Sequence, residues 1–338
     1  MITPKSQTLL DAAPGGYTWR PACREDAFEL NRLLLDIESI DQREWVDTVD
    51  DRLRDFDDPG IQIETDTLLA ITSDGRIAAS AWVFSPSEAD QEYVAFLWGE
   101  IHPEHRQHGL GTFILNWMEQ RGREILNTRP TGLPHYLKIQ ARENLIDRVQ
   151  LIQSHGFEPV RSFYRMRRDL SEPFSDWSIP KLIKLTKWSL ERNKEALQVV
   201  NEAFKDHWGF IPANEEIWHL FLVGHPTFKP DLSFMAFDNT EDDEERLVGL
   251  SINRVRDEEN ALFNRREGWI AELAVLKPWR HQGIATALLY ASMQAFRETG
   301  LDYAGLGVDT ENFSGALRIY ERAGFVPVNR DIAFVKSV

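Results

Sequence analysis

The feature that most constrains this sequence is a pattern that occurs twice. Residues 96–120 read FLWGEIHPEHRQHGLGTFILNWMEQ, and residues 269–294 read WIAELAVLKPWRHQGIATALLYASMQ. In both copies an apolar run precedes a proline, and an arginine then opens a segment of the form R-x-x-G-x-(G/A)-T. Repetition over such a distance indicates two domains built on one plan.

A second pair of similar segments lies downstream of the first. Residues 141–160 and 308–328 share an early asparagine, Asn144 or Asn312, and a later glycine. The offset differs slightly between the two pairs, which is what variation in loop length produces. A chain of 338 residues accommodates two domains of ordinary size. We expect the boundary in RRDLSEPFSDWSIPKL, which gives domains 1–170 and 171–338.

The order of the expected elements is the same in both halves. Each half shows a helix, two strands joined by a turn, the strand, loop and helix of the repeat, a further strand, a short helix and a final strand. Leading helices are expected at 24–38 and 188–204, and strands at 67–84, 135–141, 163–170, 232–255, 303–309 and 331–337. This order predicts an α+β fold, with a mixed, mostly antiparallel sheet flanked by helices in each domain.

Composition excludes several classes of function. The formal net charge of −16 argues against nucleic-acid binding, which depends on neutralising phosphates with Lys and Arg. Cys23 is the only cysteine, so neither an intrachain disulfide nor a cysteine-based zinc cluster can form, and no metal is expected. We find no signal-peptide pattern and no apolar run approaching the ~18 residues of a membrane span. We therefore expect a cytoplasmic protein that does not bind membranes.

The glycine-bearing loop after the repeated strand is suited to binding an anion. A loop that opens a helix directly after a strand presents main-chain N–H groups, and the helix dipole adds positive potential. Gly283 and Ala285 leave the backbone uncovered, while Arg280 and the Thr286 hydroxyl can add charge and a further donor. An acidic residue here would repel the anion, and the loop has none. The segment predicts a phosphate-bearing ligand.

Two common phosphate-binding motifs do not fit this loop. HGLGTFIL and QGIATALL lack the third glycine of a dinucleotide fingerprint, and neither copy has the G-K-(S/T) of a P-loop. The pattern resembles the acetyl-CoA loop of the GNAT superfamily of N-acetyltransferases, (R/Q)-x-x-G-x-(G/A) after the fourth strand. With the downstream ENFSGALRIYERAGF block and a second copy, the resemblance extends over two tandem domains, as in double-domain proteins of the mycothiol synthase type.

The resemblance implies acetyl-CoA as the cofactor and a set of residues that bind it. The main chain of the fourth strand would pair with the pantetheine arm, and the loop would hold the pyrophosphate. By position these residues are Leu273, Ala274, Val275, Arg280, His281, Gln282, Gly283, Ile284, Ala285 and Thr286 in the second half, and Gly99, Glu100, Ile101, Arg106, Gln107, His108, Gly109, Leu110, Gly111 and Thr112 in the first.

Two residues of the downstream block acquire roles from the same resemblance. Asn312 would bond near the pantetheine, or would simply cap a helix. Tyr320 matches the family's tyrosine that protonates the thiolate leaving group, although it also fits a packed helical face. The first half has Ile152 at this position, and an isoleucine cannot donate a proton. We therefore expect the second domain to be catalytic and the first to be degenerate, structural or regulatory.

A general base is also needed, because the attacking amine must lose a proton. Strand alternation places Leu273 and Val275 on one face and Glu272 on the other, so Glu272 can reach the substrate directly or through water, unless it is only a solvated carboxylate. Glu267 is a lesser candidate. His207 and Trp208 follow the first helix of the second half and either line the acceptor pocket or pack in the core.

The leading hypothesis is an acetyl-CoA-dependent N-acetyltransferase that acts on a primary amine of a small molecule by direct attack in a ternary complex. A non-catalytic acyl-CoA sensor or scaffold, and a transferase of a longer acyl group, remain open. The sequence leaves the acceptor unidentified, and we expect either a monomer or a homodimer.

Overall fold

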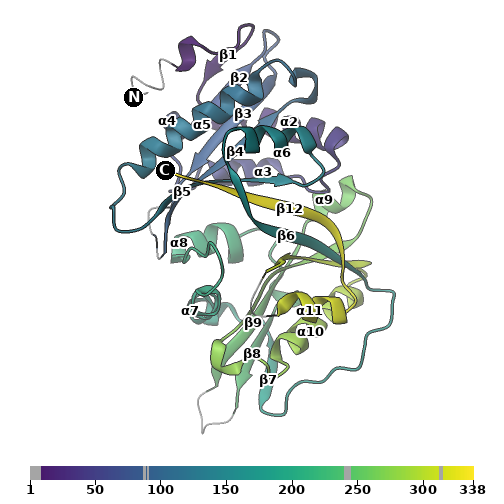
Figure 1. The fold of residues 1–338 in the computed structure, drawn as a ribbon. Helices are drawn as coiled ribbons and strands as arrows, with labels where there is room; N and C mark the ends of the chain where they lie inside the picture. The colour runs from purple at the N-terminus through teal and green to yellow at the C-terminus, as the bar shows by residue number, and fades with distance from the viewer. Residues whose placement is uncertain (1–8, 87–88, 90, 240–244, 312–314) are drawn as a thin grey trace. The chain divides into compact units, whose positions relative to one another are not determined.

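The chain forms two compact units in a computed structural model that describes residues 9–86, 89, 91–239, 245–311 and 315–338 (Figure 1). The first unit comprises Met1–Ser162 and Asp331–Val338, and the second comprises Phe163–Arg330. Each unit has a mixed sheet with flanking helices, which confirms the expected α+β class. The strand orders are β1-β2-β3-β4-β5-β12 in the first unit and β6-β11-β10-β9-β8-β7 in the second.

The elements fall where the sequence pattern placed them. The first half contains β1 (Thr18–Arg20), α2 (Ala27–Asp41), α3 (Val49–Asp55), α4 (Ile63–Asp66), β2 (Thr67–Ile71), β3 (Ile77–Phe84), β4 (Tyr93–Ile101), α5 (Leu110–Leu126), β5 (His135–Arg142), α6 (Ile146–Ser154) and β6 (Glu158–Asp169). The second half contains β7 (Ile183–Lys187), α7 (Asn193–Phe204), α8 (Glu215–Trp218), β8 (Phe234–Asp238), β9 (Arg246–Val255), α9 (Asp257–Leu262), β10 (Glu267–Val275), α10 (Ile284–Glu298), β11 (Tyr303–Asp309), α11 (Ala316–Arg322) and β12 (Val326–Ser337).

The two units exchange their last strands. Residues 163–169 of β6 pair antiparallel with β11 of the second unit, although they end the first half of the sequence. Residues 331–337 of β12 pair in the same way with β5 of the first unit. The bounds of the two units are therefore not those of the expected domains, 1–170 and 171–338. A strand belongs to the sheet with whose strands it forms hydrogen bonds, whatever its place in the chain.

The central parallel pair of each sheet separates part of the way along its length. β10 pairs with β11 only from Glu267–Tyr303 to Ile270–Leu306, and then continues to Val275 without β11 as a partner. In the first unit, β4 and β5 pair only from Tyr93–His135 to Phe96–Lys138. Both sheets therefore open between two parallel strands, at the ends that lead into the glycine loops.

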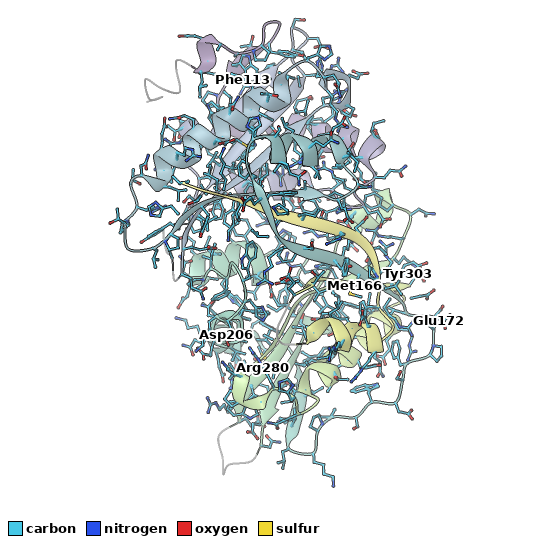
Figure 2. All side chains as sticks on the ribbon, in the orientation of Figure 1. Phe113, Met166, Glu172, Asp206, Arg280 and Tyr303 are labelled. Carbon is cyan, nitrogen blue, oxygen red and sulfur yellow. The ribbon has the colours of Figure 1, made fainter. Side chains whose placement is uncertain are left out.

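The helix after each loop packs on the sheet and fixes the loop to it. α10 buries its apolar side, including Leu289, Met293 and Phe296, against strands of the second unit. Met166, on the exchanged part of β6, is fully buried in the same core (Figure 2). In the first unit, Phe113 of α5, which is labelled in Figure 2, belongs to the corresponding core. Large-to-small changes at such positions cost roughly 2–5 kcal/mol.

Within the described parts of the chain, the search for a helix long and apolar enough to cross a membrane finds none.

Candidate active site

The loop between β10 and α10 adopts the conformation of an anion cradle. His281 and Gly283 both have positive φ, at 62° and 84°. Residues of alternating backbone handedness turn successive N–H groups toward one point. A β-carbon on Gly283 would meet only the Pro180 side chain, at 3.7 Å, so the positive φ and not crowding favours glycine here.

The first turn of α10 adds further donors to this loop. The first helical bond runs from the Ala287 N–H to the Gly283 carbonyl, at 2.9 Å. The N–H groups that precede Ala287 lie at the positive end of the helix dipole and have no carbonyl of a preceding turn to bind. Ala285 and Thr286, which the sequence singled out, lie in this turn and line the adjoining cavity. The loop can therefore hold a phosphate oxygen.

The Arg280 side chain also binds the main chain on either side of the loop. Its guanidinium donates hydrogen bonds to the Val275 carbonyl at 3.1 Å and to the Ala203 carbonyl at 2.6 Å. The arginine thus ties the loop to the end of β10 and to α7, and its positive charge stays beside the cradle. Gln282 donates to the Pro278 carbonyl at 3.1 Å and does not line the cavity.

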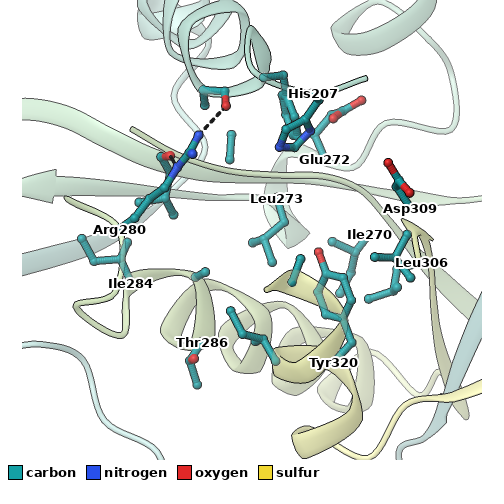
Figure 3. Close-up of a pocket in the computed structure, with 18 of the residues that line it drawn as sticks. His207, Ile270, Glu272, Leu273, Arg280, Ile284, Thr286, Leu306, Asp309 and Tyr320 are labelled. Carbon is teal, nitrogen blue, oxygen red and sulfur yellow. Dashed lines mark hydrogen bonds between the residues drawn. The ribbon is translucent and has the colours of Figure 1, made fainter. Parts of the chain in front are cut away.

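A cavity of about 550 Å³ occupies the opening between β10 and β11 in the second unit (Figure 3). Most of the site residues that the sequence predicted for the second half of the chain line this cavity. The predicted residues that line it are Glu272, Leu273, Ala274, Val275, Arg280, His281, Gly283, Ile284, Ala285, Thr286, Tyr320, His207 and Trp208. Gln282 and Glu267 do not line it, and Asn312 lies outside the described residues.

A β-bulge in β10 shapes the wall of this cavity. The register of β10 against β9 shifts between Ile270 and Glu272, so Ala271 is an extra residue. Bulges re-aim side chains and increase the local twist of a strand. In Figure 3, Leu273 points toward Tyr320, whereas Glu272 lies on the other side of the strand near His207, in agreement with the predicted alternation.

Glu272 is a carboxylate that titrates near neutrality. Removal from water raises its pKa from 4.5 to about 7, and the positive charge of Arg254 only partly opposes this. No hydrogen bond or ion pair of the Glu272 side chain is found among the described residues. A carboxylate with a pKa near 7 can accept a proton from a substrate and remain partly ionised at neutral pH.

Tyr320 provides a phenol in the same cavity. Its side chain is only 8% exposed, and α11 directs the ring toward Leu273 and Ile270 (Figure 3). Burial raises the pKa of the Tyr320 hydroxyl, and the nearby negative charge of Glu272 raises it further. Tyr320 therefore keeps its proton at all ordinary pH values. The packed helical face is confirmed, because the ring lies in the core, and Tyr320 also lines the cavity.

Some lining residues were not identified from the sequence. Phe163 comes from the exchanged β6 strand, and its ring lies 6.2 Å from that of Trp208. Asp309 ends β11 opposite Phe163. The strand pattern at 303–309 was recognised, and the polar residue at its end was the signal that could have indicated Asp309. No sequence signal indicated Phe163, because its place depends on the strand exchange.

Glu267, the lesser candidate base, does not belong to this site. It is buried and forms ion pairs with Arg165, Arg167 and Arg265 at 2.7 to 3.4 Å. It does not line the cavity. Because it is held by three guanidinium groups outside the cavity, its carboxylate is not placed to reach a substrate bound there.

The first unit repeats the loop but changes its surroundings. Gln107 and Gly109 have positive φ, at 66° and 79°, as their counterparts do. Arg106 forms a two-fold ion pair with Asp41, at 2.8 and 2.9 Å, in place of the carbonyl contacts of Arg280. The remaining predicted residues of this loop, His108, Leu110, Gly111 and Thr112, continue into α5.

The corresponding strand of the first unit has different neighbours. Its predicted residues are Gly99, Glu100 and Ile101. A β-carbon on Gly99 would lie 2.8 Å from Met118, so α5 side chains press against the strand there. The Glu100 carboxylate pairs with Arg43 at 2.9 Å and Arg148 at 3.3 Å, and these charges lower its pKa despite burial. Glu100 therefore stays ionised and paired.

Neither proton-transferring side chain of the second unit has a counterpart in the first. Counting back from the loop, Trp98 stands where the second unit has Glu272, and β4 pairs with β3 without a bulge. Ile152, at the position of Tyr320, is buried on α6. The first unit therefore lacks a glutamate and a tyrosine at the two positions that Glu272 and Tyr320 occupy in the second.

In the second unit a parallel strand pair opens over a loop that leads into a helix, and a tyrosine and a glutamate line the opening. Residues 193–325, which lie within the second unit, match the model of the Acetyltransferase (GNAT) family. The second unit is therefore similar to acetyltransferases of the GNAT family.

Known proteins resemble the chain over most of its length. The mycothiol acetyltransferase of Thermobispora bispora is 28% identical over 245 residues, which cover 69% of this chain and 73% of that protein. The structure of a GCN5-related N-acetyltransferase from Sphaerobacter thermophilus is 25% identical, with a TM-score of 0.73 and 96% of both chains covered. A tandem GNAT protein from the clavulanic acid biosynthesis pathway, 13% identical, shares the fold with a TM-score of 0.69 and covers 95% of this chain and 98% of its own.

Proposed function

We propose that the protein transfers an acetyl group from acetyl-CoA to a primary amine of a small molecule, and that the second unit carries the reaction. One observation carries the proposal. Glu272 is a base that titrates near pH 7, and Tyr320 is a phenol that keeps its proton. Both side chains line one cavity, beside a loop suited to binding an anion. An acyl transfer from a thioester to an amine needs these two groups at one place.

The residues of the second unit fit acetyl-CoA. The cradle formed by His281, Gly283 and the first turn of α10 suits its pyrophosphate. Beyond Ile270, the edge of β10 that faces β11 is released from strand pairing, so the main chain of Leu273 to Val275 can pair with an amide-bearing arm. When bound, acetyl-CoA supplies a thioester, whose carbonyl an amine can attack.

The side chains then have complementary tasks. Glu272 accepts a proton from the amine nitrogen, directly or through water, because only an unprotonated amine is a nucleophile. Tyr320 holds a proton at its hydroxyl and donates it to the departing sulfur. Main-chain N–H groups of β10 stabilise negative charge that develops on the carbonyl oxygen. Direct attack needs no nucleophilic side chain, and Cys23 lies in the first unit, outside the cavity.

Release of free CoA in the presence of a panel of primary amines tests this function. For Tyr320→Phe we expect kcat to fall by roughly 10²–10⁴-fold, the usual contribution of one positioned acid. The Kd for acetyl-CoA, measured by calorimetry, should change little, because the hydroxyl and not the ring is removed. An unchanged kcat in Tyr320→Phe would eliminate Tyr320 as the acid, and binding of acetyl-CoA without turnover on any amine would favour a sensor.

A matched substitution in the first unit serves as the control. Tyr136, on β5, is half-buried and pairs across the sheet with Ser337, far in sequence from the loops of both units. Tyr136→Phe removes a phenol hydroxyl from the same protein without touching the cavity. It should leave kcat unchanged.

A further inference from the structure

Two carboxylates lie at the end of the cavity away from the glycine loop. Glu272 and Asp309 both line this region, and Figure 3 shows their carboxylates near His207. Burial and the positive charge of Arg280 lower the pKa of His207, and the charge of Asp309 opposes this only in part, so the imidazole is mainly neutral at pH 7. The charge of Arg254 also reaches Glu272. Both arginines donate to main-chain carbonyls, so the two carboxylates are the charged groups that an acceptor meets at this end.

Aromatic side chains form the other surface at this end of the cavity. Phe163 and Trp208 lie with ring centroids 6.2 Å apart, and Phe204 packs on His207 at 4.7 Å. All four side chains line the cavity. Aromatic faces attract ammonium groups and also pack against apolar substituents. The region therefore combines attraction for a cation with a surface for an apolar or planar body.

The position of Asp309 is well fixed for recognising a charge. It is the last residue of β11 and lies opposite Phe163 in the exchanged strand. One of its carboxylate oxygens accepts the Glu311 main-chain N–H at 2.9 Å. A carboxylate held in this way has one preferred orientation, so it can distinguish acceptors by charge as well as by size.

We propose that Asp309 selects the acceptor, and that the acceptor is a cationic amine with no carboxylate on the carbon that bears the nitrogen. This rests on the proposed function, whose site it describes further. An approaching ammonium group is stabilised by Asp309 and then loses its proton to Glu272. A carboxylate beside the amine meets the carboxylates of Glu272 and Asp309, while the nearby Arg254 and Arg280 already bind main-chain carbonyls. This is how a site rejects an analogue by repulsion. Free α-amino acids are therefore excluded, whereas their amides and decarboxylated amines are accepted.

Matched acceptors test this selectivity. Phenylalanine, phenylalaninamide and 2-phenylethylamine form one set, and leucine, leucinamide and 3-methylbutylamine form a second. We measure kcat/KM by CoA release, expressed per protonated amine, because the ammonium form is the one that Asp309 would bind. For the wild type, the better of the two members of each set that lack a carboxylate should exceed the free acid by at least about tenfold. In Asp309→Asn this ratio should shrink by about tenfold, mainly through a higher KM for the amines.

Two further variants separate recognition from a general loss of charge or of structure. Asp302 precedes β11 and pairs on the surface with Arg266 at 2.6 Å, outside the cavity. Asp302→Asn removes the same charge from the same unit and should keep the wild-type ratio. Asp309→Glu keeps the charge and should retain most of the ratio, even if its kcat is lower.

The outcomes distinguish this inference from the proposed function. If the free acids react as well as the amines, or if Asp309→Asn keeps the wild-type ratio, the inference is overturned while the acetyltransferase proposal stands. If acetyl-CoA binds in calorimetry but no amine or amide of the panel reacts, the inference is overturned as well. If acetyl-CoA does not bind at all, the proposed function itself fails.

Discussion

Glu272 should destabilise the folded protein at the pH at which it works. Its pKa is raised from 4.5 to about 7 in the folded state. Between these two values the folded chain binds more protons at this site than the unfolded chain, so stability falls as pH rises through the window. Above pH 7 the full cost applies, and below pH 4.5 there is none. The shift of about 2.5 pKa units corresponds to at most about 3 kcal/mol, at 1.36 kcal/mol per unit.

Glu272→Gln removes this cost, because an amide does not ionise and has nearly the same shape. We expect the variant to be more stable than the wild type at pH 8, by about 1–3 kcal/mol, which is about 3–10 °C in Tm for a unit of this size. At pH 4.5 the two proteins should melt together. The same variant should lose transferase activity by about 10²–10⁴-fold, as expected for removal of a general base.

Thermal unfolding followed by circular dichroism at a series of pH values measures the effect without any ligand. The quantity of interest is the difference in Tm between variant and wild type, because other groups titrate equally in both. Glu267→Gln is a contrasting control, since Glu267 is held in ion pairs and its loss should be destabilising. A Glu272→Gln protein that is less stable than the wild type at pH 8, or a difference that does not change with pH, would refute the reasoning.

The remaining predictions concern the electrostatics of the base and the shape of the loop. The positive charge of Arg254 lowers the pKa of Glu272, so Arg254→Gln should raise that pKa further. The acidic limb of the pH profile of kcat/KM should then move to higher pH. A limb that stays in place would contradict this electrostatic coupling. Gly283→Ala places a side chain at a φ of 84°, a strain of roughly 1–2 kcal/mol, and should weaken acetyl-CoA binding in calorimetry. Gly300, at the other end of α10, has a φ of 83°, so Gly300→Ala carries the same strain and should reduce stability without changing acetyl-CoA affinity. Equal affinities in the two glycine variants would argue against the cradle.

Much of the architecture is local enough to be predicted from the sequence. The repeat, the order of strands and helices, and the loop conformation all follow from short-range patterns, because alternation, helical periodicity and glycine act over a few residues. The positions of Glu272 and Tyr320 within their elements could also be predicted. The first unit's lack of a proton donor was visible from Ile152 alone.

Other features depend on contacts between residues distant in the chain. β6 forms hydrogen bonds with β11, and β12 forms hydrogen bonds with β5. The first of these pairings brings Phe163 into a cavity that is built mainly by the second half of the chain. The side chain of Arg280 turns to the carbonyls of Val275 and Ala203, because α7 packs close to the end of β10. No local pattern encodes either arrangement.

The two glutamates of β10 show most clearly which features are local and which depend on the folded structure. The pattern of residues placed a glutamate in a strand and a tyrosine in a helix beside a loop suited to an anion. Folding removes Glu272 from water, so that it titrates near pH 7, and pairs Glu267, five residues earlier on the same strand, with three arginines. Desolvation and charge pairing act through space, so they are fixed only when distant segments have packed together.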